Sequence, residues 1–217
     1  MKNAIMFVLG CSVAAVMSSQ AQAEDTLCIH LYNLARVSPD TLHWATELAS
    51  RVYRRAGIST RWELRSANSA ESNTVDLNTS FANFSPLRNR PCLVLRLVRD
   101  LPAHEYPGAL GFALPLARFG VNAEIFYRRI ESQAASVGMD PYILLAYTIA
   151  HEIGHVLLRS SLHARFGIMQ AHPGAQDWRA ALFGRMAFLP EQAEQMRHEL
   201  RMARNEELQA LTRVLAP

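Results

Sequence analysis

The 217-residue sequence lacks the features that mark nucleic-acid-binding, repeat or membrane-spanning proteins. No basic run is interleaved with aromatic residues, and the net charge of +3 is mild, so nucleic-acid binding has no support. Internal repeats are absent, and no stretch is long and apolar enough to span a bilayer. The 3 cysteines include no C-x-x-C pair, so a zinc site built on cysteines is not expected.

Residues 1–23 are typical of a secretory signal peptide. Lys2 gives a positive start, residues 5–17 form a short apolar segment, and residues 21–23 are a cleavage site of the A-x-A type. Residues 24–217 then form one predicted domain, long enough for a sizeable core. We therefore expect a secreted or periplasmic protein with no stable membrane anchor. The alternative, a lipoprotein anchored at Cys11, leaves almost no apolar segment before that cysteine.

Cys28 and Cys92 are the two cysteines of the predicted mature chain, and export would place them in an oxidising compartment. Each begins an apolar, strand-like run. We expect a disulfide between them, which would close a loop of about 64 residues and stabilise the fold by up to roughly 4 kcal/mol in the chain-entropy treatment. The alternative is two separate buried thiols.

Hydrophobic periodicity predicts an α+β fold. A helix is expected to begin at Ser38-Pro39 and end at Gly57, and its core-facing stripe is apolar. Strand, helix, strand and strand in this order favour a mixed twisted sheet with helices packed on it. The predicted strands are 28–34, 58–64, 93–98 and 121–127. The other predicted helices are 142–158, a short one around Trp178, and 191–213. Residues 102–116 are predicted to be a loop.

Residues 151–155, His-Glu-Ile-Gly-His, form an H-E-x-x-H pattern inside the helix predicted for 142–158. The two histidines lie one turn apart on one helix face, where both can bind one metal ion, and Glu152 is free for proton transfer. Asp140 suits the helix cap and Pro141 the first position. The helix is apolar nearly all round, so it should be buried, and histidines without partners would cost several kcal/mol there. A pair of satisfied core histidines is the alternative to a metal site.

A catalytic metal site needs a third ligand and an open fourth position. His163 is the first candidate, because it lies eight residues after His155 in the turn that must follow the helix. His172 is the rival ligand, and Pro173 and the greater distance make it the second choice. As a fourth protein ligand, His172 would instead close the site and favour a structural or binding role.

With His163 and the Gly-Ile-Met segment at 167–169, the stretch resembles the metzincin clan of zinc peptidases, which carry H-E-x-x-H-x-x-G-x-x-H and a methionine turn downstream. Two positions depart from the clan pattern, because Leu158 stands at its glycine and Ser161 at its third histidine. A looser likeness is to secreted bacterial proteins of unknown substrate that carry HEIGH, a later histidine and Gly-Ile-Met.

The resemblance implies a metzincin-like α+β fold with a C-terminal helix and a Zn²⁺ ion held by His151, His155 and His163. Glu152 would be the general base that takes a proton from water, and Met169 would pack beneath the metal as an apolar floor. The implied function is a secreted zinc-dependent endopeptidase acting on a peptide or protein substrate.

The same resemblance implies that the strand at 121–127 forms the upper edge of a cleft, where an extended peptide can pair with it. Glu124 would then be a rim residue, or simply part of the sheet surface. Two other functions stay open at this point. One is a non-catalytic protein of the same fold that binds zinc or a peptide, and the other is a zinc amidase acting on cell-wall crosslinks.

Overall fold

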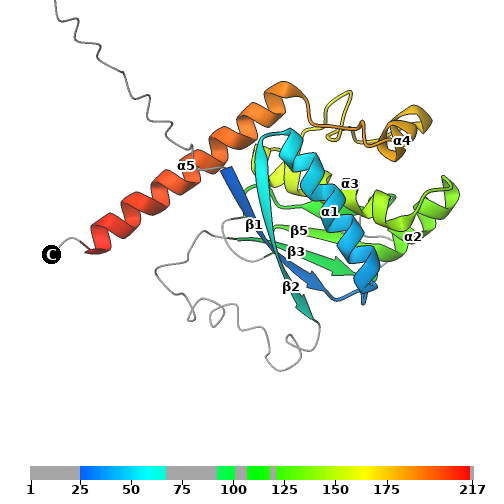
Figure 1. The fold of residues 1–217 in the computed structure, drawn as a ribbon, viewed down its shortest axis with the longest axis horizontal. Coiled ribbons are helices and arrows are strands. Elements are labelled where there is room, and N and C mark those ends of the chain that lie inside the picture. The colour runs from blue at the N-terminus through cyan, green and yellow to red at the C-terminus, as the bar shows by residue number, and fades with distance from the viewer. Residues whose placement is uncertain (1–24, 67–91, 101–106, 118–120, 216–217) are drawn as a thin grey trace, which may run out of the picture.

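The computed structural model describes residues 25–66, 92–100, 107–117 and 121–215, which form one sheet and five helices (Figure 1). The predicted signal peptide lies outside these residues and stays a prediction. None of the helices in the described part of the chain is long and apolar enough to cross a membrane.

The sheet has the strand order β2-β1-β3-β5-β4. Its strands run parallel except for β4, which lies antiparallel to β5 at one edge. In β1, Leu27, Ile29 and Leu31 point toward the helices and belong to the main hydrophobic core. The strands are β1 (Asp25–Asn33), β2 (Ile58–Ser66), β3 (Leu93–Val98), β4 (Gly111–Ala113) and β5 (Ala123–Phe126).

Helices α1 and α3 pack against each other and against one face of the sheet (Figure 1). The hydroxyl of Tyr53, a fully buried residue of α1, donates a 2.9 Å hydrogen bond to the carbonyl oxygen of Ala150 in α3. This bond anchors α3 next to its first histidine. The helices are α1 (Pro39–Arg55), α2 (Tyr127–Ser136), α3 (Pro141–Leu158), α4 (Ala175–Leu182) and α5 (Pro190–Leu215).

The ends of α1 follow from local chemistry. Ser38 stands at the N-cap in an extended conformation, and its hydroxyl oxygen accepts a 3.2 Å hydrogen bond from the backbone N–H of Thr41. Gly57 has a φ of +74°, a left-handed conformation that glycine adopts without strain, and β2 begins at the next residue. The predicted start of this helix and the predicted start of β2 are therefore confirmed, although β2 ends at Ser66 and not at residue 64. The predicted class of a mixed sheet with packed helices and a C-terminal helix is also confirmed.

Two predictions about the sheet are wrong. β5 is not the edge strand, because it lies between β3 and β4, and it ends at Phe126, directly before α2 begins at Tyr127. The edge strand is β4, which lies inside the segment that was predicted to be only a loop. Glu124 is consequently no rim residue: it is buried, and its carboxylate pairs with Arg96 at 3.5 Å.

Candidate metal centre

Helix α3 is buried around almost its whole circumference, as its apolar sequence predicts. Asp140 occupies the N-cap position and Pro141 the first turn, although the Asp140 side chain makes no capping hydrogen bond. The helix stops at Arg159, whose φ of 50° and ψ of 38° are left-handed and turn the chain back toward the histidines. Burial favours the neutral imidazole, and it lowers the pKa of His151 to about 4.

The imidazole rings of the two α3 histidines are held by backbone carbonyl groups. His151 Nδ1 lies 2.8 Å from the carbonyl oxygen of Ile168, and His155 Nδ1 lies 2.7 Å from that of Ser160. A carbonyl oxygen can only accept, so Nδ1 of each ring carries the proton and donates it. The Nε2 atoms therefore present unprotonated lone pairs, as metal ligands do.

The Nε2 atoms of three histidines converge on one point. His155 Nε2 lies 3.1 Å from His151 Nε2 and 3.3 Å from His163 Nε2, and all three atoms lie within 4.8 Å of one another. A tetrahedral ion with metal–nitrogen bonds of about 2.0–2.1 Å separates its ligand atoms by about 3.3–3.4 Å. Facing lone pairs repel each other unless a cation lies between them, so this spacing fits a metal ion.

The structure brings His163, not His172, to the two α3 histidines. Both residues are exposed, and His172 stays outside the cluster of converging Nε2 atoms. It is near enough to have an electrostatic effect: burial is the main cause of a lowered pKa at His163, and the charge of His172 adds to it. The arrangement therefore has three histidine ligands and no fourth among the residues that the structure describes.

The carboxylate of Glu152 lies on the β4 side of α3. Only 6% of the residue is exposed, and burial raises its pKa to about 8. Gly111 of β4 makes room for it, because a Cβ atom there would lie 3.1 Å from Glu152 Cγ, 3.2 Å from Glu152 Oε1 and 2.7 Å from the carbonyl oxygen of Glu124. The carboxylate is thus held between α3 and the edge strand β4.

Met169 packs against Gly154, which stands between the two histidines of α3 in the sequence. It is 1% exposed, and a Cβ at position 154 would lie 2.6 Å from its Sδ atom and 3.0 Å from Phe188 Cε1. The turn that carries Met169 is fixed by a 3.1 Å hydrogen bond from the N–H of Ile168 to the carbonyl oxygen of Ala187. The structure therefore shows the contact of Met169 with α3, and its role as an apolar floor beneath a metal stays a prediction.

An open groove of about 590 Å³ lies beside this centre. One wall is the apolar segment that follows β4, and the other is the turn that ends α3, including Ser160, whose carbonyl oxygen holds His155. Neither this groove nor the two carbonyl acceptors has a signal in the sequence, because both depend on how the backbone turns. The lining residues are Leu114, Pro115, Leu116, Ala117, Arg159, Ser160 and Ser161.

No protein-family model and no curated protein matches this chain. Among solved structures, archaemetzincin from Methanopyrus kandleri is similar, with 15% identity and a TM-score of 0.49 over 83% of this chain and 99% of that one. Metalloproteinase-II from Bacteroides fragilis is also similar, with 15% identity and a TM-score of 0.42 over 76% of this chain and 55% of that one.

Proposed function

We propose that this chain is a secreted zinc-dependent endopeptidase formed by one domain, residues 24–217. The observation that supports this most is the convergence of three Nε2 atoms, two of them 3.1 and 3.3 Å from the third. His151, His155 and His163 would hold Zn²⁺, and Glu152 would be the general base. The proposed removal of residues 1–23 agrees with the Cys28–Cys92 disulfide, a bond typical of exported proteins.

The residues fit Zn²⁺ in ligand type, number and spacing. Neutral imidazole nitrogen is a common zinc ligand, and three protein ligands with a fourth position left open are typical of catalytic rather than structural sites. Both α3 histidines are oriented by carbonyl groups through their other ring nitrogen, as zinc ligands usually are. When bound, Zn²⁺ supplies a Lewis acid that polarises a carbonyl group and makes water more acidic.

Glu152 would move the proton in this reaction. Burial alone favours the protonated acid, but the positive charge of a bound Zn²⁺ would favour the carboxylate. The carboxylate would accept a proton from the attacking water and then donate it to the nitrogen of the leaving amine, so one group would serve both steps. Its place between α3 and Gly111 of β4 excludes bulk water and puts the carboxylate next to the strand along which a substrate would lie. A purely structural zinc site has no need of a carboxylate there.

A peptide or protein fits as the substrate because of the edge strand and the groove. β4 is one of the two outer strands of the sheet, the one beside α3, and an extended peptide can add to such an edge through backbone hydrogen bonds. The groove beside it has an apolar wall that would accept a substrate side chain. The same zinc ion and Glu152 would also hydrolyse an amide bond of a cell-wall crosslink. Assays with both kinds of substrate therefore decide between a peptidase and a cell-wall amidase. The non-catalytic alternative has less support, because His172 does not close the site.

Metal analysis and a Glu152→Gln variant test this proposal. We expect about one zinc per chain after dialysis, and retention of that zinc in the variant, because glutamine leaves the three histidines in place. Loss of the base should lower hydrolysis of a quenched-fluorescent peptide library by about 10²–10⁴-fold or more. The matched control is Glu47→Gln on the exposed side of α1, which should change neither property.

Two results would contradict the proposal. A folded chain that holds less than about a tenth of an equivalent of zinc, and takes up none when zinc is added, has no such metal site. Unchanged turnover in Glu152→Gln removes the assigned base. If zinc binds but neither peptides nor cell-wall amides are cleaved, the centre belongs to a binding protein.

A further inference from the structure

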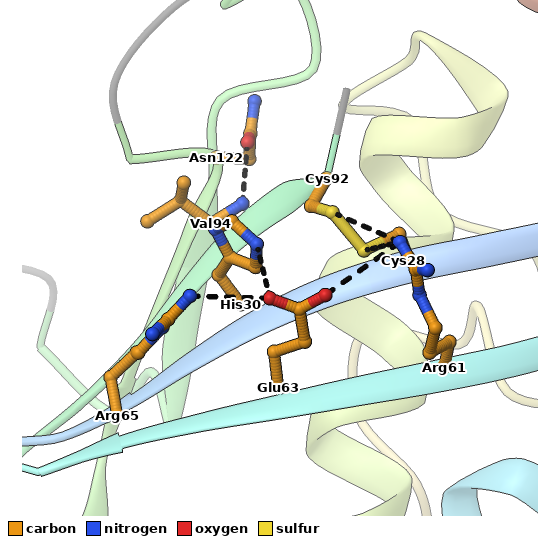
Figure 2. Close-up of a disulfide and its surroundings, with 8 residues drawn as sticks. All are labelled: Cys28, His30, Arg61, Glu63, Arg65, Cys92, Val94 and Asn122. Carbon is orange, nitrogen blue, oxygen red and sulfur yellow. Dashed lines mark hydrogen bonds and ion pairs between the residues drawn. A yellow bond between two sulfur atoms is a disulfide. The ribbon is translucent and has the colours of Figure 1, made fainter. Parts of the chain in front are cut away.

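A second group of metal-ligating side chains lies on the face of the sheet opposite the helices (Figure 2). Cys28 and His30 are two residues apart on β1 and therefore point to the same face. Glu63 stands opposite His30 in the register of β1 with β2, and Cys92 directly precedes β3, where Leu93 pairs with Ile29. Neighbouring parallel strands thus bring these four side chains together.

The four ligand atoms are already close to one another. Each of the side chains offers one atom, and these atoms all lie within 4.8 Å of one another. His30 Nε2 and Glu63 Oε2 are 3.0 Å apart, near the roughly 3.3 Å edge of a tetrahedron around zinc. Cys28 and Cys92 are joined as a disulfide with a Cα–Cα distance of 4.5 Å.

Breaking the disulfide would supply the two ligands that are missing. In a tetrahedron with Zn–S bonds of about 2.3 Å the two sulfur atoms are about 3.8 Å apart, a separation that side-chain rotation alone can provide on adjacent strands. Arg61 Nη2 lies 3.1 Å from Cys28 Sγ and 3.9 Å from Cys92 Sγ. A guanidinium in this position favours the thiolate over the thiol and can donate a hydrogen bond to it.

The charges around the group also suit a cation with thiolate ligands. Two thiolates and the Glu63 carboxylate would bring three negative charges, and these would face the two positive charges of a divalent ion and one each on Arg61 and Arg65. Arg61 and Arg65 flank Glu63 on β2 and contact it at 3.7 and 3.3 Å, on different carboxylate oxygens, while His30 of β1 contacts it at 3.0 Å (Figure 2). The carboxylate needs only one oxygen to bind a metal.

We propose that the reduced chain binds a second Zn²⁺ ion through Cys28, His30, Glu63 and Cys92. A dithiol reductant transfers two electrons and two protons to the sulfur–sulfur bond, which gives two thiols and the oxidised cyclic disulfide of the reductant. Zinc then displaces the two thiol protons. Four protein ligands make this a closed, structural site, separate from the three-histidine centre and not dependent on the proposed peptidase function.

The second site would hold the same two points of the chain that the disulfide holds. Cys28 and Cys92 are 64 residues apart, so the bond closes a long loop onto β1. Reduction alone removes the covalent link between Cys28 and Cys92. Reduction in the presence of zinc would replace it with a link through the metal ion. The fold would therefore survive reduction when zinc is present and lose stability when zinc is removed.

Cobalt(II) titration of the predicted mature chain, residues 24–217, tests the site, because thiolate-to-cobalt charge transfer gives a near-ultraviolet band that histidine ligands do not give and Cys11 is absent. The chain is reduced with a dithiol, freed of reductant by gel filtration without oxygen, and titrated beside the oxidised chain. We expect the band after reduction only, and zinc binding that rises from about one to about two ions per chain. In the oxidised chain, the three-histidine centre is read separately from the visible bands of cobalt.

Variants assign the ligands. His30→Ala and Glu63→Gln should each weaken cobalt binding to the reduced chain at least about 10-fold, while His43→Ala at an exposed position of α1 should not. Absence of a thiolate band after reduction overturns the proposal, and so does a band that both variants leave unchanged. If reduction unfolds the chain, circular dichroism with added zinc decides: recovery of the fold supports the site, and continued unfolding rejects it.

Discussion

Replacing Gly154 with alanine should disturb the contact between α3 and the turn that carries Met169. The new Cβ would lie 2.6 Å from Met169 Sδ and 3.0 Å from Phe188 Cε1, both closer than carbon normally approaches. Overpacking of this kind costs about 1–3 kcal/mol, whereas alanine is favoured over glycine inside a helix by about 1 kcal/mol. We therefore expect the free energy of unfolding to fall by up to about 2 kcal/mol.

A double-mutant cycle separates this contact from other effects. Met169→Ala alone should cost about 2–5 kcal/mol, because the side chain is buried and leaves a cavity. In the double variant the new methyl group at position 154 enters part of that cavity, so the combined cost should be smaller than the sum of the two by about 0.5–3 kcal/mol. Gly174→Ala, at the N-cap of α4, is a control only for adding a methyl group without a clash, because its Cβ would come no closer than 3.6 Å to Asp177 Oδ2.

The measurement is urea unfolding of the metal-free chain with its disulfide intact, so that zinc binding adds nothing to the stability. Zinc affinity is then measured by competition. Met169 directly follows Ile168, whose carbonyl oxygen holds His151, so Gly154→Ala should also weaken zinc binding on the roughly 10–100-fold scale of changes outside the ligands. The double-mutant cycle decides, because the gain in helix propensity can offset the overpacking in the single variant. Costs that simply add in the double variant would refute this account of the packing.

The third ligand and the buried carboxylate of β5 can each be tested by one substitution experiment. His163→Ala should lower zinc affinity more than about 100-fold and His172→Ala less than about 10-fold, and competition titrations that give the reverse order would move the third ligand. Burial raises the pKa of Glu124 above its ordinary 4.5, an effect that pairing with Arg96 partly offsets. The folded chain thus holds this proton more tightly, and the contribution of Glu124 to stability falls as the pH rises through about 4.5. Between about pH 4 and 7 the free energy of unfolding of the wild type should fall relative to that of Glu124→Gln. If the difference between the two free energies does not change with pH, the pKa of Glu124 is not raised in the folded chain.

The elements predicted correctly from sequence are those whose ends are marked by local chemistry. Ser38 with a following proline begins α1, and Gly57 ends it, while Asp140 and a proline mark the start of α3. α2 was missed because it begins directly after β5 without a side-chain cap or an acidic first turn. β4 was missed because it has only three residues, and it is a strand only through its pairing with β5.

In the candidate sites, too, the parts set by local sequence were predictable, and the parts set by the path of the backbone were not. Helix geometry alone brings His151 and His155 together, so their convergence follows from a four-residue spacing. The place of His163 depends on the left-handed turn at Arg159, for which the sequence has no glycine as a signal. The second group of ligands was not predictable from spacing, because Cys28 and Cys92 meet through sheet register rather than through a C-x-x-C pair.

The segment after α3 does more than supply a third histidine. Its backbone carbonyl groups at Ser160 and Ile168 also orient His155 and His151, so one stretch of chain sets the positions of all three rings. Met169 fixes that stretch against Gly154. Because the rings are held by folding, a metal ion that binds them orders few side chains and retains more of its binding free energy. The four-residue spacing brings the two α3 histidines together, and the glycine between them makes room for Met169 of the turn. A metal site can therefore exist only when α3 and this turn fold together.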